Sequence, residues 1–150
     1  MHSAISRLAA FAALSAALVL SGCATWFFTP DRSARYVDED GVFLYVDFAS
    51  DKTPHVTKFI TPAGLEMEYK SPLKVRVTAP SGERFVAYEN MCPTGTLYVT
   101  DDGQWEFFCQ GSYCILAERS EDGDGYEQRF EGVVCAKLKA PREDGGRRRR

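Results

Sequence analysis

Short stretches of alternating apolar and polar residues follow one another along the chain from residue 41 onward. In the clearest stretch, apolar residues at 73, 75 and 77 alternate with polar residues at 74, 76 and 78, which is typical of a half-buried strand. No stretch of this region has a convincing helical period. The pattern predicts strands at 42–48, 56–60, 65–69, 73–77, 84–88, 96–100, 105–109, 115–119 and 126–137.

Turn-forming residues separate these stretches. The Asp-Asp-Gly turn at 101–103 lies between two predicted strands and is a strong hairpin signal, and an Asp-Gly-Asp-Gly turn occupies 122–125. Many short strands joined by such turns indicate an all-β fold, a small antiparallel barrel or sandwich of about eight strands. We expect this domain to span residues 36–139.

The N-terminal region has the layout of a secretory signal. Arg7 precedes a 13-residue stretch, 8–20, that is apolar except for Ser15 and is too short for a membrane-spanning helix, which needs about 20 residues. The residues that follow, Leu20 to Cys23, resemble the bacterial lipobox. The resemblance implies a signal peptide at 1–22 and a lipidated Cys23 that begins the mature chain. The alternative is an ordinary cleaved signal with an incidental cysteine.

A lipidated Cys23 would hold the protein on a membrane through several acyl chains, palmitate among them, and residues 23–35 would form a tether. By resemblance to lipoproteins, Ala24 favours the outer membrane. We therefore expect an outer-membrane lipoprotein that faces the periplasm or the cell surface.

Charge is distributed unevenly along the chain. Residues 36–138 hold 18 acidic and 9 basic side chains, a net charge of −9, which argues against a nucleic-acid ligand and favours a cationic partner. A merely solubilising acidic surface remains the alternative. The closing segment, 140–150, ends in four arginines and is predicted to be a disordered basic tail. The tail is either inert or attracted to anionic polymers or lipids of the envelope.

The mature domain contains four cysteines, Cys92, Cys109, Cys114 and Cys135, and an even number in an oxidising compartment is typical of two disulfides. Hairpins centred on the Asp-Asp-Gly and Asp-Gly-Asp-Gly turns would pair Cys92 with Cys109 and Cys114 with Cys135. The rival pairing joins Cys109 to Cys114 and leaves the other two to meet over a long separation. Gaps of 16, 4 and 20 residues match no usual zinc spacing.

Residues for catalysis are scarce in the mature chain. His55 is its only histidine, and no serine lies in a nucleophile-elbow pattern. A calcium loop starting at Asp122 would need a ligand where Tyr126 stands. We expect binding rather than enzyme activity, with no metal and no cofactor.

Residues 67–138 resemble the membrane-bound inhibitors of C-type lysozyme. The segments that carry this resemblance are 68–69, 72–75, 85–90, 94–98, 102–103 and 107–111, together with Cys135. The resemblance implies an all-β domain that captures lysozyme, with the partner-binding residues Thr94, Thr96, Tyr98 and Gln110 clustered on loops at one edge.

The chain departs from that family at the positions that matter most. Thr94 and Gln110 stand where the family has an inhibitory serine and an inhibitory lysine that engage the catalytic carboxylates of lysozyme. A threonine still donates a hydrogen bond, whereas a glutamine lacks the charge that pairs with a carboxylate. The family's first cysteine falls near Ser71, so its disulfide cannot be reproduced unchanged. A structural or assembly accessory of the cell envelope is therefore the alternative function.

Overall fold

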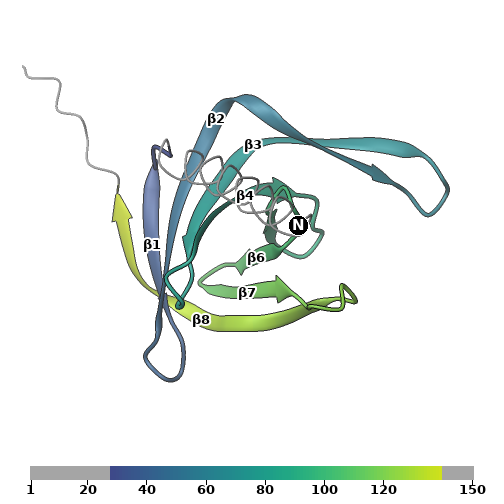
Figure 1. The fold of residues 1–150 in the computed structure, drawn as a ribbon. Helices are drawn as coiled ribbons and strands as arrows, with labels where there is room; N and C mark the ends of the chain where they lie inside the picture. Colours follow the sequence, from purple (N-terminus) through teal and green to yellow (C-terminus); the bar gives the residue numbers. More distant parts are fainter. Residues whose placement is uncertain (1–27, 140–150) are drawn as a thin grey trace, which may run out of the picture.

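The computed structural model describes residues 28–139, and in these residues eight antiparallel strands form one closed barrel (Figure 1). Each strand pairs with its neighbours in sequence, and β1 closes the barrel against β8. The strands are β1 (Arg32–Val37), β2 (Phe43–Ile60), β3 (Glu66–Thr78), β4 (Arg84–Asn90), β5 (Thr96–Val99), β6 (Trp105–Gln110), β7 (Tyr113–Arg119) and β8 (Tyr126–Lys139). The predicted all-β antiparallel fold is confirmed. The predicted signal peptide, Cys23 and the basic tail lie outside the described residues.

The predicted tether extends too far along the chain. β1 begins at Arg32, inside the segment assigned to the tether, and Phe28 is already buried against the outside of the barrel. Its ring lies below the cationic groups of Lys74 and Arg76, at 5.2 and 5.1 Å from the ring centroid. Strand β1 was not predicted because Ala34 and Tyr36 are its only buried residues, and two positions are too short an alternation to recognise.

The barrel interior is packed with apolar side chains from every strand. Alternate residues point inward, as the pleat of a strand requires, and seven of the side chains are almost completely inaccessible to solvent. They are Phe107, Leu44, Leu116, Val46, Val75, Val77 and Cys114. Near the β1–β8 seam, a Cβ atom at Gly132 would lie 2.4 Å from the carbonyl oxygen of Val37, so only glycine fits there. The interior of the barrel is therefore filled with side chains.

Among the described residues, no helix has the length and apolar character needed to cross a bilayer.

Two pairs of predicted strands are single long strands. The predicted strands 42–48 and 56–60 both belong to β2, and 65–69 and 73–77 both belong to β3. Pro54 and Pro72 lie where the β2–β3 register shifts between Ser50 and His55. Proline is tolerated there because the ladder needs no N–H from it.

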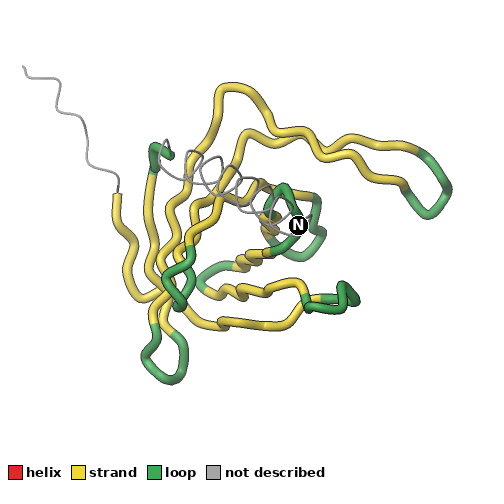
Figure 2. Tube along the Cα trace, in the orientation of Figure 1, coloured by secondary structure: helices red, strands yellow, loops and turns green. Residues whose placement is uncertain are grey.

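Beyond this shift, β2 and β3 leave the barrel as a two-stranded ribbon, which we call the arm (residues 51–71; Figures 1 and 2). In the arm the two strands pair only with each other, because β1 pairs with 43–48 of β2 and β4 with 74–78 of β3. The His55 ring stacks on Tyr88 at 4.0 Å, and the Tyr69 hydroxyl donates to Glu89 at 2.7 Å. These contacts fix the base of the arm to β4, while its tip projects into solvent.

Candidate partner-binding surface

The structure brings two of the predicted partner-binding residues to neighbouring loops. Thr94 lies in the β4–β5 loop and Gln110 ends β6, and both are exposed. Because Thr96 pairs with Cys109, the β4–β5 loop runs beside the β6–β7 turn. Gly95 allows this approach, since a Cβ atom there would lie 2.6 Å from the carbonyl oxygen of Cys109.

Tyr98 does not belong to that surface. Its side chain is only 4% exposed and packs inside the barrel against Phe48 and Phe107, with ring centroids 6.3 and 6.2 Å apart. The prediction that Tyr98 contacts a partner on a surface loop is wrong, because the pleat turns residue 98 inward and its neighbour Leu97 outward. Thr96 is half-buried on the inward side with Tyr98.

The predicted disulfides are also absent: all four cysteines of the described residues are free thiols. The β6–β7 turn is so short that Gln110 pairs with Tyr113, which places Cys109 opposite Cys114. Cys114 pairs on its other side with Gly132, three residues before Cys135. The predicted pairs Cys92–Cys109 and Cys114–Cys135 are wrong, because the β5–β6 register places Thr96 opposite Cys109 and the β7–β8 register places Gly132 opposite Cys114.

The four thiols lie in different environments. Burial raises the pKa of the Cys109 thiol to about 12 and also raises that of Cys114. Hydrogen bonding to the backbone and hydroxyl of Thr94 lowers the pKa of Cys92 in its loop. Cys135 lies exposed on β8, where its Sγ atom is 3.4 Å from the Nε atom of Arg35. Only the thiolate is nucleophilic, so these differences set the order of reactivity.

We expect iodoacetamide to modify Cys92 at neutral pH while Cys109 and Cys114 stay unmodified until strongly alkaline pH. A lowered pKa increases the thiolate fraction at a given pH, and a raised pKa decreases it. Mass spectrometry of each cysteine peptide across a pH series measures this. Thr94→Val should move the Cys92 profile to higher pH. Equal labelling of Cys92 and Cys114 in the folded protein would contradict the assignment.

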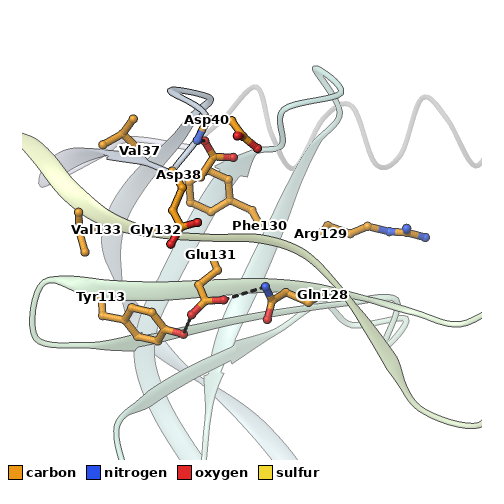
Figure 3. Close-up of a pocket in the computed structure, with 11 residues that line it drawn as sticks. Val37, Asp38, Asp40, Tyr113, Gln128, Arg129, Phe130, Glu131, Gly132 and Val133 are labelled. Atoms are coloured by element: carbon orange, nitrogen blue, oxygen red, sulfur yellow. Dashed lines mark hydrogen bonds between the residues drawn. The ribbon is translucent and has the colours of Figure 1, made fainter.

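An acidic pocket of about 560 Å³ lies where β8 runs past the end of β1 (Figure 3). The β1–β2 turn contributes Asp38, Glu39 and Asp40, and β8 contributes Glu131. Asp38 is held in place because it accepts hydrogen bonds from the backbone N–H groups of Asp40, at 2.9 Å, and Val42, at 2.8 Å. The pocket thus gathers four carboxylates, three of them from one turn.

Hydrogen bonds from Tyr113 and Gln128 orient Glu131 and lower its pKa, so this carboxylate stays charged. None of the four carboxylates forms an ion pair within residues 28–139. Arg129 lines the same pocket, but its guanidinium pairs with Glu118 and Glu127 at 3.3 and 3.1 Å. Within the described residues, the pocket therefore presents uncompensated negative charge to solvent.

Tyr113 connects this pocket to the loops described above. It pairs with Gln110 across the β6–β7 turn and its hydroxyl reaches Glu131. The loop pair and the acidic pocket therefore form one continuous surface. The run of acidic residues at 38–40 is visible in the sequence, but the closure of β8 against β1 is needed to place Glu131 beside it.

Comparison of the chain with known protein families, with curated proteins and with solved structures found no match.

Proposed function

We propose that this chain is an outer-membrane-anchored lipoprotein that captures a basic protein of the C-type lysozyme class. The observation that carries the proposal is the acidic pocket of Asp38, Glu39, Asp40 and Glu131, which adjoins the exposed Gln110 loop. Its uncompensated charge attracts a cationic protein and orients it as it approaches. The loop resemblance to lysozyme inhibitors and the lipobox at Cys23 support the same proposal.

Under this proposal the chain works by binding. The partner sits over Thr94 and Gln110, and the acidic pocket contacts basic side chains at the edge of the interface. Charges at the edge of an interface act mainly on the association rate. At physiological ionic strength, salt largely screens the attraction between exposed charges that are more than about 8 Å apart. Association should therefore slow as the salt concentration rises.

The test compares two double variants that remove the same charge from different places. Glu39→Gln/Asp40→Asn neutralises the pocket, and Glu121→Gln/Asp124→Asn neutralises the exposed β7–β8 turn. We expect the pocket variant to slow association with a basic C-type lysozyme several-fold and to flatten its salt dependence, with a smaller effect from the turn variant. Equal effects of the two variants, or no effect, would contradict the role of the pocket.

The arm favours the second function, that of an accessory in envelope assembly. Ile60 is 70% exposed and Leu65 64% exposed near its tip, and no strand of the described chain pairs with either edge of the arm. A two-stranded ribbon is marginally stable alone in water, and free edges recruit an extended strand from a partner protein. Loss of envelope integrity on deletion of the protein, together with absence of lysozyme binding, would favour this function over the first.

A further inference from the structure

We propose that the barrel mouth near the start of β1 binds an anionic amphiphile, a small molecule with a carboxylate or phosphate head on a short apolar body. A cavity of about 470 Å³ opens there, surrounded by inward-facing residues of β1, β2, β5, β6 and β8. It is separate from the acidic pocket, with which it shares no residue. The residues that carry the argument are Arg32, Lys137, Tyr36, Tyr98 and Phe48.

The charge of the mouth is opposite to that of the body. Of the ten described residues that surround the cavity, two are the cations Arg32 and Lys137, and none is a carboxylate. Neither cation forms an ion pair with another described residue. The guanidinium of Arg32 instead lies over the Phe48 ring, 3.7 Å from its centroid. Two unpaired cations within an acidic domain indicate that an anion is attracted to this opening.

The cavity also contains a hydroxyl that nothing in the described chain satisfies. Tyr98 is only 4% exposed and lines the cavity, and its hydroxyl has no hydrogen-bond partner among the described residues. The hydroxyl is not a sealed, orphaned atom, since His55 Nδ1 is the one such side-chain atom in the described residues, so it is accessible from the cavity and free to bond a ligand head there. Burial raises the pKa of Tyr98 and of Tyr36, which keeps both phenols protonated as hydrogen-bond donors.

These groups select both parts of the ligand. Arginine and a protonated phenol together hold the oxygens of a carboxylate or a phosphate, and lysine adds a second positive charge. Phe48, Ala34 and Val134 form an apolar wall beside them. Because Phe107 and Leu116 fill the centre of the barrel, the apolar body must be short.

Calorimetric titration of the full chain tests the proposal, with octanoate and octyl phosphate as probes below their micelle concentrations. Octylammonium provides the cationic control, and inorganic phosphate tests the head alone. We expect saturable binding of one or both anionic amphiphiles. The tighter of the two identifies the head as carboxylate or phosphate. Absence of binding, or equal binding of octylammonium or of inorganic phosphate, would overturn the proposal.

Variants then locate the site. Arg32→Gln/Lys137→Gln should weaken binding at least tenfold, because charge-assisted contacts to the head are lost. Arg35→Gln is the matched control, since Arg35 lies on the same strand but outside the barrel, and it should leave binding unchanged. Tyr98→Phe should weaken binding several-fold without lowering the melting temperature.

If Arg32→Gln fails to fold, two further variants test whether the ligand binds at these cations. Lys137→Gln should weaken binding, and Arg32→Lys should preserve it. Unchanged binding in Lys137→Gln would overturn the assignment.

Discussion

Leu116→Ala is expected to destabilise the domain by about 2–5 kcal/mol, the usual cost of removing a large buried aliphatic side chain. Leu116 is 0% exposed inside the barrel, and the rigid strands around it cannot close the space that alanine would leave. Since small domains are stable by only about 5–15 kcal/mol, this loss is a large share of the total. Denaturant unfolding of the full chain, followed by circular dichroism, measures it.

Leu65→Ala provides the matched control. The same residue type is 64% exposed at the far end of the arm, so its truncation should change stability by no more than about 0.5 kcal/mol. Similar losses in the two variants would mean that the apolar contacts of the arm contribute as much to the fold as the barrel core does, which would contradict the described packing.

Gln110→Lys is expected to strengthen lysozyme inhibition about ten- to a hundredfold under the proposed function. A charged donor at this position restores an interaction with the enzyme's carboxylates, and hydrogen bonds to charged groups contribute about 1.5–3 kcal/mol. Gln110 is exposed at the β6–β7 turn, so the change should leave the fold intact. An inhibition titration of the variant against the native chain provides the measurement.

Ser112→Lys tests whether any added charge in this turn has the same effect. Ser112 is exposed in the same turn, two residues away. It should not strengthen inhibition, because its side chain occupies a different position and the added charge repels a basic enzyme. Equal strengthening by both variants would remove the special role of residue 110.

Alternation was sufficient to predict the fold class, because half-buried strands such as β6 expose one face and bury the other. Continuity of the long strands could not be predicted. Residues 51–54 and Pro72 have the composition of turns, and only pairing between β2 and β3 keeps them extended. Strand β1 is stabilised by its neighbours β2 and β8 rather than by a strong pattern of its own.

The candidate surface was less accessible to sequence reasoning for a similar physical reason. In β5 both Leu97 and Tyr98 are apolar enough to be buried, so the sequence does not indicate which one points inward. The cysteine pairing depended on the registers of β5–β6 and β7–β8, which place Thr96 opposite Cys109 and Gly132 opposite Cys114, and turn composition alone does not indicate these registers. The acidic pocket and the barrel mouth combine residues from strands far apart in sequence, so barrel closure has to be known before either can be recognised.

The most direct test of the proposed function is the rate at which a basic C-type lysozyme hydrolyses cell walls as the concentration of the native full chain increases. We expect the rate to fall saturably at micromolar concentrations of the chain, and the inhibition to weaken as salt is added. An undiminished rate with the native chain and with Gln110→Lys alike would contradict the account, and the role of an envelope accessory would take its place.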